Sequence, residues 1–135
     1  MNTWSPEDLA LLTAHGSLVL TAGDGHPDGV ETGMVLVRGA LYVRAFRGTG
    51  SRWFRAAREH GRGRIRVGPA THEVLFAACG AGPAAEIDVA YRDRYGPAAA
   101  LVHSPAARAA TLRIDPAPAR STAFVSIPTA FSSIP

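Results

Sequence analysis

The amino-acid sequence predicts one α+β domain built around a small antiparallel β-barrel with flanking helices. Successive segments of strand pattern are separated by short turns, which favours antiparallel pairing between neighbours. Several of these segments are apolar on both faces, which is typical of a barrel rather than an open sheet. The length of 135 residues suits one domain with a single core.

The chain begins with a predicted helix and a strand. Ser5 supplies a capping hydroxyl, Pro6 occupies the first helical position, and acidic residues follow in the first turn. The helix is expected to end near Gly16, and the apolar run 17–22 has the pattern of a buried strand. Residues 23–29 are rich in glycine, proline and aspartate, so they are predicted to form a loop.

Residues 34–37 and 41–46 have the pattern of two further strands. The three residues between them include Gly39, which allows the positive φ of a tight hairpin. Alternation along the second strand puts Leu41, Val43 and Ala45 on one face and Tyr42, Arg44 and Phe46 on the other.

An amphipathic helix is predicted over residues 51–60, after a glycine-rich loop. Residues 64–67 alternate as a strand with arginines facing outward, and a turn leads into another strand at residues 72–79. The apolar side of the helix carries Trp53, Phe54 and Ala57.

The last predicted elements are a helix over residues 85–95 and a strand over residues 110–114. The barrel domain is assigned to residues 1–120, and residues 121–135 to a tail rich in proline and small residues. Within this tail, residues 123–127 have the pattern of an additional edge strand.

The composition indicates a globular protein that favours anionic partners. Hydrophobic residues make up 47% and charged residues 19%, which is a globular balance rather than a disordered one. All 14 basic residues are arginine, whose guanidinium suits phosphate or carboxylate, although a merely solvated surface is the alternative. With a single cysteine, no signal peptide and no apolar run of about 20 residues, the chain is expected to be cytoplasmic and without a membrane partner.

The best candidate site in the sequence is the segment 44–58. A strand leads through a glycine-containing loop into a helix N-terminus, whose free backbone N–H groups attract anions. The alternative is that Ser51 only caps the helix and the arginines face solvent. The groups that would form a phosphate or carboxylate pocket are the hydroxyls of Thr49 and Ser51 and the guanidinium groups of Arg44, Arg47 and Arg52.

The helix over residues 85–95 contains a second candidate site. Asp88 and Tyr91 are candidate acid, base or substrate hydrogen-bonding residues, and His72, at the start of a strand, is a third. The alternative is structural: Asp88 pairs with Arg92, and Tyr91 is a core residue with a satisfied hydroxyl. The five histidines lack the spacing of metal ligands, so no metal site is predicted.

Four segments, at residues 33–38, 41–43, 49–52 and 64–67, together resemble the core of the pyridoxamine-phosphate-oxidase-type split barrels. One position departs from that pattern, because the superfamily often has arginine where this chain has Gly33. The resemblance implies FMN or a deazaflavin bound at the interface of a homodimer, with its phosphate held by Arg38, Ser51 and Arg52.

A second set of motifs covers nearly the whole chain. It consists of Trp4 with Pro6-Glu7, residues 41–44, 51–54 with Ala57, 73–74, 87–92, 94–96 and 110–113. Together these motifs resemble a bacterial family known as domain of unknown function 2255. Since that family has no established activity, the resemblance implies a fold rather than a reaction.

Three functions are expected from these observations. The first is an oxidoreductase or cofactor carrier using FMN or a deazaflavin, with the phosphate end framed by Arg44, Ser51, Arg52 and Trp53. The second is a cofactor-independent cyclase or isomerase of specialised metabolism, which would act on an anionic small molecule through Asp88, Tyr91, His72 or an arginine. A nucleic-acid-binding module, which would use Arg62, Arg64 and Arg66, ranks last because no exposed aromatic residue is interleaved with them.

Overall fold

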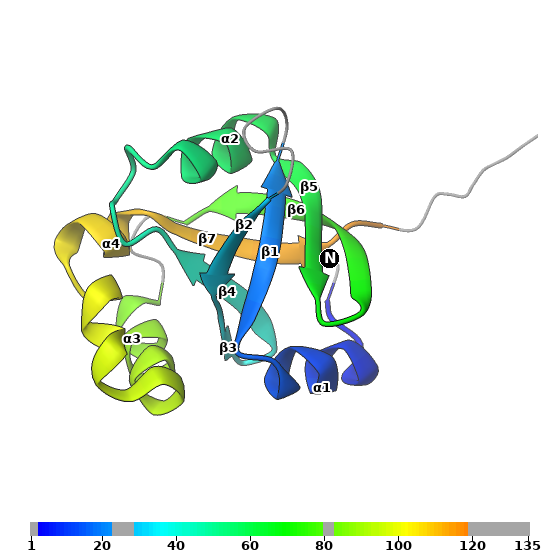
Figure 1. Cartoon of the computed structure of the whole chain (residues 1–135), viewed down its shortest axis with the longest axis horizontal. Coiled ribbons are helices and arrows are strands. Elements are labelled where there is room, and N and C mark those ends of the chain that lie inside the picture. The colour runs from blue at the N-terminus through cyan, green and yellow to red at the C-terminus, as the bar shows by residue number, and fades with distance from the viewer. Residues whose placement is uncertain (1–2, 23–28, 80–82, 119–135) are drawn as a thin grey trace, which may run out of the picture.

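The computed structural model describes residues 3–22, 29–79 and 83–118. Within them, seven antiparallel strands form one sheet that curls into a nearly closed barrel with helices around it, which confirms the predicted α+β split-barrel architecture (Figure 1). Most of the predicted loop 23–29, and the whole of the tail 121–135 with its expected edge strand, lie outside the described residues.

The elements follow one another in the predicted order, with three additions. The helices are α1 (Pro6–Ala14), α2 (Arg52–His60), α3 (Ala84–Tyr95), the 3₁₀ helix η1 (Gly96–Val102) and α4 (Pro105–Ala109). The strands are β1 (Ser17–Ala22), β2 (Val30–Gly33), β3 (Val35–Val37), β4 (Ala40–Arg44), β5 (Arg62–Val67), β6 (Ala70–Ala78) and β7 (Thr111–Pro116). Strand β2 and helices η1 and α4 were not predicted.

Local signals account for the start of α1 and for the β3–β4 hairpin. The Ser5 hydroxyl accepts a hydrogen bond from the Asp8 N–H at 3.1 Å, as its capping position predicts. Between β3 and β4 the two-residue turn Arg38-Gly39 has φ of 53° and 80°, which is the geometry of a tight hairpin turn. Helix α4 starts with the same signal as α1, because Ser104 caps it and Pro105 follows, so the pattern was available in the sequence.

The barrel nearly closes because the two edges of the sheet are consecutive in the chain. The strand order is β2-β1-β5-β6-β7-β4-β3, and only Met34 separates β2 from β3. The chain therefore passes from the β1–β2 pair at one edge of the sheet to the β3–β4 pair at the other edge through a single residue. The backbone of Met34 belongs to neither ladder, so its polar groups need other partners.

Tyr95, the last residue of α3, supplies those partners. The Met34 N–H donates to the Tyr95 hydroxyl at 2.7 Å, and the carbonyl oxygens of Met34 and Gly16 lie 2.8 Å and 2.7 Å from the same hydroxyl. A Cβ atom at Gly33 would lie 3.1 Å from this hydroxyl. The missing side chain at Gly33 thus gives Tyr95 room to seal the seam of the barrel.

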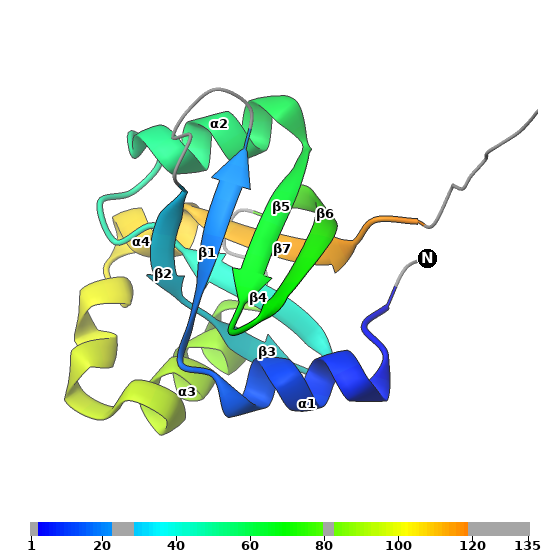
Figure 2. The same cartoon turned by 45° about the vertical axis from the view of Figure 1, so that its right-hand side comes forward.

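The core has an inner and an outer part. The inner part fills the barrel, and α1 and α2 cover its two ends, with Leu12 and Phe54 reaching into it (Figure 2). The outer part lies between α3 with η1 and the outer face of β3 and β4, where Ile87 and Tyr91 pack against Val35. The predicted alternation along this strand is confirmed, because Leu41, Val43 and Ala45 face the inner core, whereas Tyr42 belongs to the outer core.

Replacing Tyr95 by phenylalanine is expected to destabilise the protein by about 1–3 kcal/mol, because the Met34 N–H loses its partner at a part-buried position. Chemical denaturation with urea measures this loss. Tyr42→Phe is the matched control, since the Tyr42 side chain is buried in the outer core and makes no contact with the seam through its hydroxyl. Equal stability of the two variants would contradict the role given to Tyr95.

Candidate functional site

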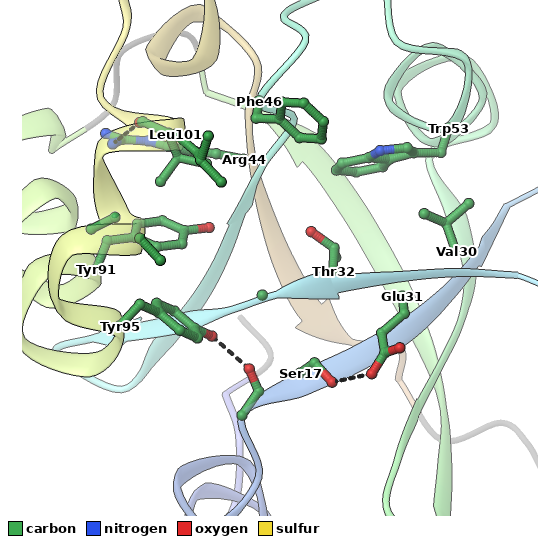
Figure 3. A pocket seen from close by; sticks show the side chains of 15 residues that line it. Ser17, Val30, Glu31, Thr32, Arg44, Phe46, Trp53, Tyr91, Tyr95 and Leu101 are labelled. Carbon is green, nitrogen blue, oxygen red and sulfur yellow. Dashed lines mark hydrogen bonds between the residues drawn. The ribbon is translucent and has the colours of Figure 1, made fainter.

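An apolar cavity of about 430 Å³ lies where the sheet splits, between β2 and the helical layer of α3 and η1. Its walls include Thr32, Phe46, Trp53, Tyr91 and Leu101 (Figure 3). Phe46 and Leu101 are 54% and 65% exposed, so the rim of the cavity presents apolar surface to solvent. A volume of this size suits a small organic molecule.

A second cavity, of about 610 Å³, adjoins the first and is cationic. Both cavities share Val30, Phe46 and Trp53 as walls, and the second adds Arg47, Ser51 and Arg52. These last residues surround the N-terminus of α2, where backbone N–H groups point outward and the helix dipole favours negative charge.

Ser51 occupies the N-cap position of α2 but makes no capping hydrogen bond with its side chain. The Ser51 side chain therefore does not cap the helix, which was the alternative to a ligand-binding role. Arg47 and Arg52 are exposed at the same place, and the Arg47 guanidinium lies 5.5 Å from the centre of the Phe46 ring. The second cavity thus combines a hydroxyl donor with two positive charges.

Arg44 also lines the apolar cavity, and its side chain is fully buried. Its Nη1 donates to the Asp88 carboxylate at 2.5 Å and to the Val102 carbonyl at 3.0 Å. Its Nε donates to the Thr111 hydroxyl at 3.2 Å, and its Nη2 reaches the Ala84 carbonyl at 3.4 Å. Most donors of this guanidinium are used within the protein, so the charge holds the fold rather than a ligand.

Asp88 receives two guanidinium groups. Besides Arg44, Arg108 of α4 donates to its second oxygen at 2.6 Å. Desolvation alone would raise the pKa of Asp88, but the hydrogen bonds and charges of Arg44 and Arg108 outweigh it and lower the pKa. A carboxylate held in this way stays ionised near neutral pH and has no proton to give.

Tyr91 is 3% exposed, and the Arg44 guanidinium lies 5.7 Å from the centre of the Tyr91 ring. Among the described residues its hydroxyl has no hydrogen-bond partner. Burial, together with the neighbouring Tyr95, raises the pKa of Tyr91 well above its usual range, although Arg44 opposes this shift through its backbone N–H and its charge. The hydroxyl is therefore protonated and able to donate.

A family model described as "Uncharacterized protein conserved in bacteria (DUF2255)" matches residues 22–114. This range includes most of the residues that line the two cavities, and the Arg44–Asp88 pair. The chain belongs to the DUF2255 family. No curated protein and no solved structure matches the chain. No helix among the described residues of this DUF2255 protein is long and apolar enough to cross a membrane.

The DUF2255 structure brings together part of the predicted cofactor site. Ser51, Arg52 and Trp53 line the cationic cavity, and Arg44 lines the adjoining apolar cavity. Arg38 does not join them, because it stands in the β3–β4 turn with its side chain 79% exposed and pairs with Glu86.

The predicted catalytic residues are also separated. His72 packs edge-on against Trp4 at 5.4 Å and lies 3.7 Å from Asp8, so it belongs to the α1 side and lines neither cavity. Asp88 pairs with Arg44 and Arg108, not with Arg92 as the helical spacing suggested. Of these three residues, Tyr91 alone lines the apolar cavity. The alternative prediction, that the Tyr91 hydroxyl is satisfied, was wrong, because the hydroxyl has no hydrogen-bond partner among the described residues.

Several residues at the site were not predicted from the sequence. Glu31 and Thr32 line the apolar cavity from β2, whose short run next to a glycine-rich loop carries no clear strand pattern. Leu101 and Arg108 come from η1 and α4, which were not predicted. The arginines of β5 are exposed as expected, and Arg64 pairs with Glu73 on the neighbouring strand.

Replacing Asp88 by asparagine is expected to cost about 3–5 kcal/mol of stability near neutral pH, because it leaves the buried Arg44 charge without its counter-ion. Since folding lowers the pKa of Asp88, its contribution is complete above the unfolded-state value of about 3.9 and is lost as the pH falls through the folded-state value. The stability difference between wild type and variant should therefore shrink as the pH falls from about 5 to 3.

Urea denaturation at a series of pH values measures this difference. Asp115→Asn is the control, because Asp115 pairs with the more exposed Arg113 at 3.1 Å and should cost about 1 kcal/mol or less. A difference between wild type and Asp88→Asn that stays constant over this pH range would contradict the assignment.

Proposed function

We propose that this DUF2255 protein binds a planar small molecule with an acidic group, and that a flavin of the FMN or deazaflavin type is the leading candidate. The observation that carries the proposal is the shared wall of the two cavities. Because Phe46 and Trp53 line both, one ligand can place an aromatic ring system in the apolar cavity and an anion among the arginines beside it.

The apolar half suits a flat ring system. Phe46 and Trp53 offer aromatic faces, and Leu101 adds an apolar edge at the rim (Figure 3). Covering Phe46 and Leu101, which are more than half exposed, would remove apolar surface from water and favour binding. The cavity is therefore suited to stacking more than to a charged group.

The cationic half suits a phosphate or carboxylate. Arg47 and Arg52 provide two positive charges, Ser51 provides a hydroxyl donor, and the N-terminus of α2 provides backbone N–H groups. These donors stand in for the phosphate ligands of the split barrels that the sequence resembles, with Arg47 in place of Arg38.

One position of this chain differs from those split barrels for a structural reason. Tyr95 packs over Gly33, so an arginine at residue 33 would crowd the hydroxyl that seals the barrel. The phosphate subsite of a flavin would therefore depend on Arg47, Ser51 and Arg52. Their donor chemistry fits such a group.

An oxidoreductase activity follows from this proposal, since a bound flavin supplies electron and hydride transfer. The chain's own part would be to hold the phosphate through Ser51 and Arg52, to stack the ring on Trp53 and to exclude water with Phe46. Asp88 would not exchange protons with the substrate, because its two arginines keep it ionised.

A cofactor-independent isomerase or cyclase is the second candidate, and Glu31 supports it. The Glu31 carboxylate lies at the apolar cavity, where it accepts a hydrogen bond from the Ser17 hydroxyl at 2.6 Å. Together with the protonated Tyr91 it would offer a base and a hydrogen-bond donor to one substrate. Activity of this kind would survive removal of all flavin.

The proposal includes a homodimer in which a second copy covers the exposed rim residues Phe46 and Leu101. Leu101→Glu is expected to reduce the dimer fraction measured by light scattering, because it places a charge in the covered surface. Val89→Glu is the control, since Val89 is exposed on α3 away from the cavity lining. A wild-type protein that is monomeric at all concentrations would contradict this part.

Titration with FMN and with riboflavin tests the central proposal. FMN is expected to bind at least tenfold more tightly than riboflavin, because only FMN carries the phosphate. Arg52→Ala should weaken FMN binding about three- to tenfold and leave riboflavin binding unchanged, with the larger effect at low salt.

Arg55→Ala is the matched control, because Arg55 is exposed on the same helix but lines neither cavity. Flavin fluorescence or calorimetry gives the affinities. Equal affinity for FMN and riboflavin, or equal effects of the two substitutions, would count against an anion subsite at α2. Reconstitution with a deazaflavin separates the two cofactor types.

A further inference from the structure

Two tyrosines of α3 differ in the hydrogen bonding of their hydroxyl groups. Tyr95 uses its hydroxyl fully at the barrel seam, with three hydrogen-bonding contacts between 2.7 and 2.8 Å. Tyr91, one helical turn earlier, is more deeply buried than Tyr95, yet its hydroxyl has no partner among the described residues. A buried donor left unpaired costs free energy, so its retention needs an explanation beyond packing.

The Tyr91 hydroxyl points into the apolar cavity. Figure 3 shows it directed toward the space beside Trp53 and below Phe46. The Thr32 side chain reaches the same space from β2, with its hydroxyl directed inward. Two hydroxyl groups from elements far apart in the sequence thus converge in a cavity whose other walls are mainly apolar.

The surroundings define the kind of group these hydroxyls can bind. Arg44 does not compete for it, because its guanidinium already donates to Asp88, Val102 and Thr111. The Tyr91 hydroxyl keeps its proton and has no acceptor among the described residues, so it is able to donate to an acceptor on a ligand. In a cavity with stacking walls, that acceptor is a carbonyl oxygen or ring nitrogen at the edge of a planar molecule.

We infer that Tyr91 and Thr32 form the specificity-determining edge of the apolar cavity and recognise hydrogen-bond acceptors on the rim of a planar heteroaromatic ligand. This inference rests on the proposed function and deepens it, because it states which edge of the ligand faces the interior. It concerns the ring system alone and does not depend on the anion subsite at α2.

The test uses lumichrome, a planar ring system with carbonyl oxygens and ring nitrogens but no phosphate, and naphthalene, which has no acceptor. Tyr91→Phe is expected to weaken lumichrome binding about tenfold, and Thr32→Val, which keeps the shape of the side chain, about threefold. Both variants should bind naphthalene within about twofold of the wild type. Ligand-observed NMR measures both probes.

Tyr42→Phe is the matched control and should bind both probes like the wild type, because Tyr42 does not line the cavity. The urea midpoint of unliganded Tyr91→Phe should be equal to or higher than that of the wild type, since the substitution removes an unpaired hydroxyl. A lowered midpoint would assign the hydroxyl a structural role instead.

Unchanged lumichrome affinity in Tyr91→Phe, or equal loss for both probes, would overturn the inference. So would a wild-type protein that does not bind lumichrome. A different result would contradict the proposed function, namely equal affinity for FMN and riboflavin. Only that comparison tests the binding of the phosphate.

Discussion

The buried guanidinium of Arg44 joins the barrel to its helical layer, and the positions of the cavity walls follow from that connection. It sits on the outer face of the barrel and ties β4 to α3 through Asp88, to η1 through Val102 and to β7 through Thr111. A charge removed from water must be matched by acceptors, and here the acceptors come from the helical layer. The layer therefore has to dock at one place on the barrel, which also places Tyr91 and Leu101 at the cavity wall. An arginine that sequence pattern suggested as a ligand thus builds the site without occupying it.

The seam of the barrel imposes the second constraint. A chain that passes from β2 to β3 in one residue leaves the Met34 backbone outside both ladders, and the Tyr95 hydroxyl satisfies it. A side chain at residue 33 would crowd this hydroxyl, because a Cβ atom there would lie 3.1 Å from it. The absence of a side chain at residue 33 therefore fits the way in which this barrel is closed.

These two constraints leave a cavity with an uneven distribution of chemistry. One end has arginines and a hydroxyl around a helix N-terminus, the middle has the aromatic walls of Phe46 and Trp53, and the inner edge has the hydroxyls of Thr32 and Tyr91. Asp88 and His72 are engaged elsewhere, so neither supplies acid–base chemistry there. Such a gradient from charged to apolar to neutral polar suits an elongated, flat and acidic ligand.

Features that depend on neighbouring residues could be predicted from the amino-acid sequence. The cap at Ser5, the turn at Gly39 and the alternation along β4 follow from local backbone and side-chain preferences, and the structure confirms each of them. The partners of Asp88 depend instead on the three-dimensional fold: they are Arg44 and Arg108 rather than Arg92 four residues away. Closure of the barrel brings the distant arginines to the carboxylate, and burial makes that pairing stronger than a solvated helical pair. The same closure separates Arg38 and His72 from the cavities, because distances through space are set by the pairing of strands and not by spacing along the chain.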